Sequence, residues 1–500
     1  MRVCGWRWVW AVVVVCAAMS TTARAQTFTT LVNFDVTDGS FSQAALMQGV
    51  DGNFYGTTYY GGICGLCGTV FKVTPGGTLT TLHDFCSKND CLDGENPIGN
   101  LMQASDGNVY GVTFYGGSDY QDCHNSRCGT IFKIDSTGKL TRFYSFCGLT
   151  NCAEGVFPMA GLLQASNGNF YGATTGGGAD RAGTIFEVTP AGKMTLLHSL
   201  CSQPGCTDGS YIVSSLVQAL NGNLYGATAD GGDMSSGCNP PYGCGTIFEI
   251  TPQGKLTTIF TFHGPDGSNP AGLIEASNGK IYGVTWSGGT GNGCPLSEYP
   301  RGCGTLFEIT SGGKLTTLYN FCSLANCMDG VGPNGPPIQA IDGNFYGTTL
   351  QGGANNWGAI FRVTPAGALT TLYSFCALAN CIDGAIPNAG LVQATNGLLY
   401  GTTSEAGASG GGTIFSLDMG LGPFISFIRN PAKIGQQFGI LGYGLTGTSS
   451  VSFNGISANF KTQSDTLLIA TVPAGATTGY VTVTTPSGAL TSNVPFHVIR

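Results

Sequence analysis

Seven acidic side chains recur at matching places along the chain, each followed directly by glycine. They are Asp38, Asp93, Glu154, Asp208, Asp266, Asp329 and Asp383. An Asp in a tight loop accepts hydrogen bonds from backbone N–H groups, and such a structural role suits a residue that every repeat contains. The alternative is calcium binding, since Ca²⁺ takes carboxylate oxygens; Asp93, Asp208, Asp266, Asp329 and Asp383 would then ring a central axis. A single axial ion does not need seven donors, so we expect no cofactor and keep calcium as the alternative.

Aromatic side chains supply the other candidate chemistry. Beyond the first 25 residues the chain holds two tryptophans, Trp286 and Trp357, and both are expected in long loops, as are Tyr115, Tyr242 and Tyr299. Exposed aromatic rings stack on sugar rings or cover apolar protein surface. These five residues are therefore the candidate binding residues, and packing against the disulfides of their own loops is the alternative.

Catalytic motifs do not stand out in the sequence. It has no Gly-x-Ser-x-Gly on a strand–helix elbow, no His-Glu-x-x-His and no phosphate loop before a helix. His83 and His198 occupy a position that tyrosine takes in other repeats, which indicates a packing role. We therefore assign no catalytic residue.

The cysteines fall into local pairs. Apart from Cys4 and Cys16 they are Cys64/Cys67, Cys86/Cys91, Cys123/Cys128, Cys147/Cys152, Cys201/Cys206, Cys238/Cys244, Cys294/Cys303, Cys322/Cys327 and Cys376/Cys381. Both members of a pair are present or neither is, as disulfides require, because half a pair would leave a reactive thiol. Local disulfides are typical of an oxidising, secretory compartment. Structural zinc at Cys64-x-x-Cys67 is the alternative, but a second pair with that spacing is missing.

These residues lie within a sequence repeat that occurs seven times in the chain. Its full form is Asn/Asp-Gly-Asn, Tyr-Gly, a Gly-rich stretch, Gly-Thr-Ile-Phe and Leu-Thr-Thr-Leu-x-x-Phe. The tyrosine of the Tyr-Gly pair falls at Tyr55, Tyr110, Tyr171, Tyr225, Tyr282, Tyr346 and Tyr400. A period this long means that each copy is one supersecondary unit that cannot bury its apolar face alone.

One copy, residues 101–146, predicts how the unit folds. Residues 101–104 and 109–113 are two short strands around an Asp-Gly-Asn turn, and 129–134 and 140–146 are two more. Four antiparallel strands per unit, repeated in a ring, make a β-propeller. One copy of the fourth strand, residues 28–34, precedes all other strands, and the last repeat lacks its own. We expect residues 28–34 to complete the last blade and close the ring; an open solenoid is the alternative.

The two ends of the chain predict export and a second domain. Residues 1–25 have the features of a signal peptide: two early arginines, a short apolar run and Ala23-Arg24-Ala25 before the cleavage point. No transmembrane segment is expected after cleavage, because no other apolar run is long enough. Residues 26–419 are the seven-repeat propeller. Residues 420–500 have no cysteine and alternate Val, Thr, Ile and Phe, which predicts an Ig-like β-sandwich. The expected fold class is therefore all-β.

Charge narrows the range of partners. The net charge of the whole chain is −8, and cleavage of the signal removes three arginines, which leaves −11. An acidic chain without clusters of Lys or Arg disfavours nucleic acid and anionic lipid as partners.

Two family resemblances follow from these motifs. The repeat resembles the GloVer tandem repeat of "choice-of-anchor" bacterial proteins over residues 27–419, and segments 450–455, 458–460, 465–466 and 472–479 resemble an IPT/TIG domain, an Ig-like module. The first resemblance implies export and often a C-terminal sorting signal. Because the sequence ends in Phe496-His-Val-Ile-Arg500 without an apolar tail, we expect no anchor of that kind. Neither resemblance implies a catalytic residue.

These observations predict a bacterial protein, secreted or on the cell surface, that binds or supports rather than catalyses. Its partner would be a glycan or an extracellular protein. The propeller face that carries the cysteine pairs and both tryptophans is the expected binding face, with loops 230–244 and 287–303 as its most distinctive part. The alternatives are an extracellular polysaccharide lyase or hydrolase, which would need one blade with unique acid, His or Arg residues, and a spacer in a surface layer.

Overall fold

The computed structural model describes residues 26–499 except 88, 119–122, 124–126, 220, 235–237, 239–241, 292–293, 295–301 and 429. Its helical elements are 3₁₀ turns: η1 (Asn89–Cys91), η2 (Thr150–Cys152), η3 (Pro204–Cys206), η4 (Ala325–Cys327) and η5 (Ala379–Cys381). Among the described residues, no helix has the length and apolar character needed to cross a membrane.

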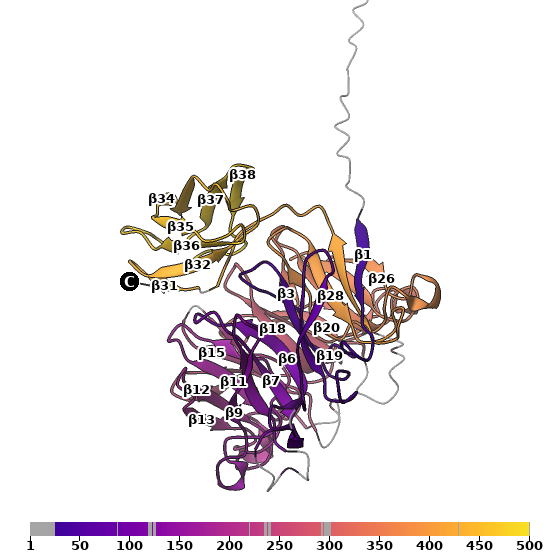
Figure 1. The fold of residues 1–500 in the computed structure, drawn as a ribbon. Coiled ribbons are helices and arrows are strands. Elements are labelled where there is room, and N and C mark those ends of the chain that lie inside the picture. Colours follow the sequence, from indigo (N-terminus) through magenta and orange to yellow (C-terminus); the bar gives the residue numbers. More distant parts are fainter. Residues whose placement is uncertain are drawn as a thin grey trace, which may run out of the picture.

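Each repeat folds into one antiparallel sheet whose strands follow chain order (Figure 1). The first sheet contains β2 (Met47–Gln48), β3 (Phe54–Thr58), β4 (Thr69–Val73) and β5 (Leu79–Asp84). The next four sheets are β6 (Glu95–Gln103), β7 (Val109–Tyr115), β8 (Thr130–Ile134), β9 (Leu140–Ser145); β10 (Leu163–Gln164), β11 (Phe170–Thr174), β12 (Thr184–Val188), β13 (Met194–Ser199); β14 (Val217–Gln218), β15 (Leu224–Thr228), β16 (Thr246–Ile250), β17 (Leu256–Thr261); and β18 (Ser268–Glu275), β19 (Ile281–Ser287), β20 (Thr305–Ile309), β21 (Leu315–Asn320). In the sixth sheet both β22 (Val331–Pro333) and β23 (Ile338–Gln339) pair with β24 (Phe345–Gln351), which is followed by β25 (Ala359–Val363) and β26 (Leu369–Ser374).

The last repeat is completed by the N-terminal strand. Its sheet has the order β1 (Thr27–Asn33), β29 (Thr413–Asp418), β28 (Leu399–Thr403), β27 (Val392–Gln393). β1 runs antiparallel to β29, from Thr27 opposite Asp418 to Asn33 opposite Thr413. Figure 1 shows the indigo strand β1 among the orange strands of the last repeats. The predicted pairing of residues 28–34 with the last repeat is therefore confirmed.

Contacts inside each sheet explain the repeated motif. The glycine of the Tyr-Gly pair lies under the ring of the Gly-Thr-Ile-Phe phenylalanine; a Cβ on Gly172, for example, would be 2.5 Å from Phe186 Cζ. The threonine that closes the same strand bonds to the threonine of Gly-Thr-Ile-Phe, as Thr174 does to Thr184 at 2.8 Å. The Tyr-Gly tyrosine is buried in every repeat but the first, and its hydroxyl bonds to an acidic side chain in most repeats, as Tyr110 does to Asp106. The residues of the motif are therefore those that pack the two central strands of each sheet together.

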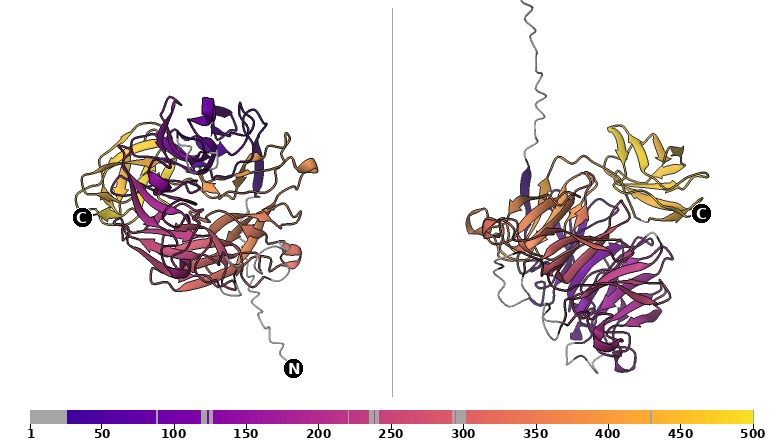
Figure 2. Two further views of the ribbon diagram at one scale, coloured as in Figure 1. Left: turned by 90° about the horizontal axis from the view of Figure 1, so that it is seen from below. Right: turned by 180° about the vertical axis from the view of Figure 1, so that it is seen from behind.

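Two further sets of hydrogen bonds join each sheet to the next. In every sheet but the fifth, which has Glu275 there, a glutamine in the innermost strand accepts a bond from the preceding sheet's turn. One of these bonds, Thr395 N–H to Gln48 Oε1 at 3.0 Å, joins the last sheet to the first. On the other face, a residue with a left-handed backbone donates its N–H to a carbonyl of the preceding sheet. These residues are Phe41, Asn96, Phe157, Tyr211, Asn269, Gly332 and Ile386, with φ between 53° and 64°. The sheets therefore follow one another around a ring (Figure 2).

The C-terminal residues form two further sheets beside the ring (Figure 2). One has the order β30 (Ser426–Phe427), β32 (Gln437–Leu441), β36 (Leu467–Thr471), β35 (Phe460–Thr462), and the other β34 (Ile456–Ser457), β33 (Ser450–Phe453), β37 (Val481–Thr485), β38 (Gly488–Thr491). A short parallel pair, β31 (Ala432–Lys433) and β39 (Val498–Ile499), completes this part. Their inward side chains share one apolar core that extends from Ile425 to Phe496.

Candidate functional site

The recurrent acids lie at the outer strands, where they hold the loop that follows. Asp208 accepts bonds from His198 on β13 (3.1 Å), the Ser202 hydroxyl (2.7 Å) and two backbone N–H groups. Asp329 and Asp383 bond in the same way to Tyr319 and Tyr373 and to two N–H groups each. The acids thus accept hydrogen bonds from backbone N–H groups of a tight loop, which is the structural role that their recurrence in every repeat favours.

The calcium alternative gains no geometric support from this arrangement. Asp93 bonds to His83 on the outer strand β5, and Asp266 accepts the His263 N–H. All five candidate ligands thus lie by the outer strands, whereas the cavity on the ring axis is lined by residues that surround the innermost strands. In the described part of the chain these carboxylates do not converge on the axis. His83 and His198, for which a packing role was expected, each form a hydrogen bond with the aspartate of the following loop.

Eight of the nine predicted cysteine pairs are disulfides in the structure. They are Cys64–Cys67, Cys86–Cys91, Cys123–Cys128, Cys147–Cys152, Cys201–Cys206, Cys238–Cys244, Cys322–Cys327 and Cys376–Cys381. Cys64 and Cys67 are bonded to each other, which leaves no zinc ligand pair there. The ninth pair differs from the expectation: Cys294 and Cys303 are not joined, and their thiols share a hydrogen bond. That bond and burial raise the pKa of the Cys303 thiol. This pair encloses a longer stretch of chain than the others, so the sequence constrains its sulfurs least.

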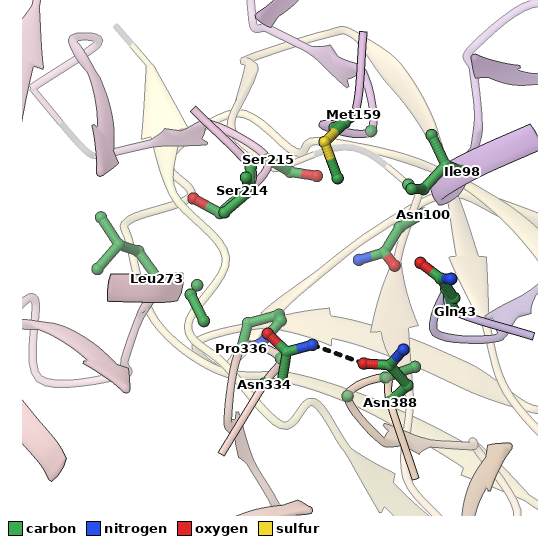
Figure 3. A pocket seen from close by; sticks show the side chains of 18 of the residues that line it. Gln43, Ile98, Asn100, Met159, Ser214, Ser215, Leu273, Asn334, Pro336 and Asn388 are labelled. Carbon is green, nitrogen blue, oxygen red and sulfur yellow. Dashed lines mark hydrogen bonds between the residues drawn. The ribbon is translucent and has the colours of Figure 1, made fainter. Parts of the chain in front are cut away.

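A cavity of about 370 Å³ lies on the ring axis, where every sheet contributes residues next to its innermost strand (Figure 3). One side is apolar, with Ile98, Met159 and Val213. The polar side chains that line the cavity are all uncharged. They are Gln43, Asn100, Ser214, Ser215, Asn334 and Asn388. No titratable side chain lines the cavity among the described residues.

Several of these polar groups keep hydrogen-bonding capacity. Asn334 Nδ2 donates to Asn388 Oδ1 at 2.6 Å (Figure 3). Asn100 Oδ1 accepts the Ala45 N–H at 2.9 Å. The other polar atoms of these side chains make no hydrogen bond within the described part of the chain. The Ser214 hydroxyl is buried and has no partner there either. Buried polar groups normally have partners, so this cavity is suited to a ligand with hydroxyl or amide groups.

Trp286 borders a second cavity that adjoins the first. This cavity of about 280 Å³ is lined by Val213, Ala229, Asn269, Ala271, Trp286 and Asn334, of which Val213, Ala271 and Asn334 also line the axial cavity. The expected loop position of Trp286 is wrong: it lies in strand β19, because β18 pairs along that strand as far as Ser268 opposite Ser287. The structure therefore brings one predicted binding residue to the axial site.

The other aromatic candidates do not join it. Trp357 is exposed in the loop between β24 and β25, and Tyr242 is exposed before β16. Tyr115 ends strand β7 rather than lying in a loop, since β6 pairs along β7 up to Glu95 opposite Tyr115. Its ring packs edge-on against Phe114 and Phe157. Tyr299 lies outside the described residues.

Sequence reasoning missed the amides of the axial cavity. Gln43, Asn334 and Asn388 stand at one place before the innermost strand, where Ile98, Met159 and Val213 stand in other repeats. An alignment of the seven copies at this place would have shown polar side chains in an otherwise apolar column. The signal is weak because the segment belongs to no repeated motif.

Two solved structures illustrate the distant similarity of this chain to known proteins. A catalytically inactive variant of virginiamycin B lyase from Staphylococcus aureus with quinupristin is 13% identical, with a TM-score of 0.48, and the match covers 79% of this chain and 99% of that chain. The PQQ-bound aldose sugar dehydrogenase from Streptomyces coelicolor is also 13% identical, with a TM-score of 0.38, covering 79% and 98%. No curated protein matches the sequence.

The repeat itself identifies the family. The family described as Gloeobacter/Verrucomicrobia repeat matches residues 17–155, 120–294 and 238–455. These overlapping matches extend over most of the chain and over all the sheets of the ring. The chain therefore belongs to the Gloeobacter/Verrucomicrobia repeat family.

Proposed function

We propose that the chain is a seven-bladed β-propeller followed by an Ig-like module of the IPT/TIG type, divided near residue 420. The sheets around the axial cavity support the first part, because each repeat contributes one and β1 completes the last. The two sheets with one shared core between Ile425 and Phe496 support the second. Local disulfides indicate an oxidising, extracytoplasmic setting. This setting suits a protein secreted by a bacterium or held on its surface.

We propose that this protein binds a glycan at the axial cavity without catalysing a reaction. The observation that carries the proposal is the composition of the cavity: uncharged amides and hydroxyls with unused hydrogen-bonding capacity, continuous with a pocket beside an indole ring. Sugars present hydroxyl groups around an apolar ring face, and an aromatic ring with nearby amides matches both. An anionic glycan is disfavoured by the net negative charge of the chain.

The alternative of a polysaccharide lyase or hydrolase gains no support from this site. Such chemistry usually needs a general acid and a base or nucleophile at the reacting bond. Among the described residues, the two cavities contain only amides, hydroxyls, one thioether and one indole as functional side chains.

Binding of a glycan panel by the purified chain from residue 26 onward tests the proposal. Hits should weaken at least tenfold in Asn334→Ala and Trp286→Ala, and Trp357→Ala should bind as the unaltered protein does, because Trp357 lines neither cavity. Loss of binding in Trp357→Ala alone would place the site on the loops. A panel without hits would contradict the proposal.

A further inference from the structure

The pocket at Trp286 is lined by residues of three consecutive repeats, and the fifth and sixth together place its indole. In every other sheet the left-handed residue before the innermost strand carries a side chain, whereas in the sixth sheet it is Gly332, with φ 64°. A Cβ on Gly332 would be 3.1 Å from Trp286 Nε1. The glycine thus leaves the space that the indole occupies, and the half-buried indole borders the pocket.

One acidic side chain stands beside this pocket. Asp230 directly follows Ala229, and its Oδ1 is 3.4 Å from Nδ2 of Asn269; both Ala229 and Asn269 line the pocket. Asp230 forms no ion pair with any described Lys, Arg or His residue. His263, from the segment after β17, is paired instead with Asp233 at 2.7 Å. Burial raises the pKa of Asp230 to about 6, and the phenol of Tyr211 is the titratable group that senses its charge.

A partly buried carboxylate that pairs with no described cation, and an indole that lines the pocket next to it, have the same preferred partner. The carboxylate gains from a positive charge because its own water has been partly removed, and an indole face attracts an ammonium group through its quadrupole. At the corresponding place the other sheets carry Tyr60, Tyr115, Gly176, Ser287, Gln351 and, in the last sheet, the carboxylate Glu405. A carboxylate at this place is therefore confined to two repeats and is not a general feature of the fold. The net negative charge of the whole chain also favours a positively charged ligand.

We infer that this pocket recognises an amino sugar, with Asp230 facing the sugar's ammonium group and Trp286 beneath the ring. The inference rests on the proposed glycan-binding function and adds the chemical class of the ligand: a saccharide with free amino groups, as in a glucosamine oligomer. Its N-acetylated counterpart offers no positive charge, and a uronic acid oligomer would be repelled.

Calorimetric titration with three trisaccharides separates the possibilities: glucosamine, N-acetylglucosamine and galacturonate oligomers of equal length. The unaltered protein should bind the glucosamine oligomer at least tenfold more tightly than the N-acetylated one, and should not bind the galacturonate. Asp230→Asn preserves the shape of the side chain and should abolish the preference. Asp233→Asn is the matched control, since it removes an acid from the same loop that is already paired with His263, and should keep the preference.

The outcomes distinguish this inference from the proposal on which it rests. Equal binding of the glucosamine and N-acetylglucosamine oligomers, or a preference that survives in Asp230→Asn, would overturn the inference and leave glycan binding standing. Failure of all three oligomers together with an empty glycan panel would overturn both. Thermal unfolding of each variant establishes that a loss of binding does not come from a loss of fold.

Discussion

At the scale of single residues, the glycine of each Tyr-Gly pair is fixed by the aromatic ring above it. Gly172→Ala would place a Cβ 2.5 Å from Phe186 Cζ and 2.9 Å from Leu162 Cδ2, both in the interior of the sheet. Overpacking of this kind costs about 1–3 kcal/mol, so we expect a lower midpoint in denaturant unfolding. Gly76→Ala is the control: its nearest contact would be 3.9 Å and its φ is not positive. Equal stability of the two variants would contradict the packing argument.

Two aspartates should respond to pH in opposite ways. Burial tends to raise the pKa of Asp208, but hydrogen bonds from Ser202, His198 and the backbone outweigh it and hold the pKa below its ordinary value. Asp208 therefore stabilises the fold above the unfolded-state pKa, and this contribution is lost as the pH falls through the folded-state value. Asp208→Asn should cost about 1–3 kcal/mol near neutral pH, and the loss should shrink in acid.

Asp230 should show the reverse. Its folded-state pKa of about 6 lies above the ordinary value of 3.8, so its charge opposes folding above pH 6 and ceases to matter below 3.8. Asp230→Asn should therefore stabilise the protein by about 1 kcal/mol near neutral pH, after allowance for partial exposure, and have no effect in strong acid. Urea unfolding at several pH values measures both variants. A destabilising Asp230→Asn at neutral pH would show that the carboxylate has a cationic partner in the free protein.

The residue scale also shows what the sequence can reveal. The recurrent acids and the Tyr-Gly pairs were visible because each has a similar structural role in most repeats. The left-handed residues that join the sheets were not visible, since Phe41, Asn96, Gly332 and Ile386 share a backbone conformation and no side-chain chemistry. The amides of the axial cavity were missed for a related reason: they differ between repeats because they face the cavity rather than the packed interior.

At the scale of elements, the stability of the ring depends on β1, which completes the last sheet. Phe28 stacks on Tyr373 with ring centroids 3.8 Å apart, and Val32 and Phe34 are buried. Deletion of residues 26–36 removes this packing and a complete strand ladder, so it should cost several kcal/mol. Thermal unfolding measures the loss. Thr29→Ala, an exposed change in the same strand, should leave stability within about 0.5 kcal/mol; a deletion variant as stable as this control would refute the role of β1.

Strand lengths mark the limit of prediction at this scale. The four strands of each repeat follow from the alternating motifs, and the displaced first strand follows from the order of the motifs in the chain. The ends of β7 and β19 do not, because their last residues are held by pairing with β6 and β18, whose early residues follow no repeated motif. Trp286 and Tyr115 were placed in loops for this reason.

At the scale of the whole molecule, the C-terminal part contacts the junction between the last sheet and the first, here called the seam. Phe424 N–H donates to Thr395 O at 3.1 Å, and Thr466 Oγ1 donates to Val50 O at 2.8 Å, so the C-terminal part contacts both the last sheet and the first. Those two sheets are themselves joined by Gln48 and Thr395. The chain also connects these two sheets directly, because β1 belongs to the last sheet and leads into β2 of the first, so the C-terminal part adds further contacts to this junction.

Removal of the chain beyond residue 423 should therefore loosen the seam rather than the whole ring. Two lost hydrogen bonds of about 1 kcal/mol each correspond to a roughly tenfold or greater rise in local opening. Hydrogen exchange followed by mass spectrometry should detect faster exchange in β2, β3, β27 and β28, with little change in β14–β16 on another part of the ring. Lys461→Ala, an exposed change within β35, is the control and should alter neither region. Uniform acceleration around the ring would instead mean that the C-terminal sheets stabilise the fold globally, and unchanged exchange at the seam would mean that β1 and Gln48 hold it closed without them.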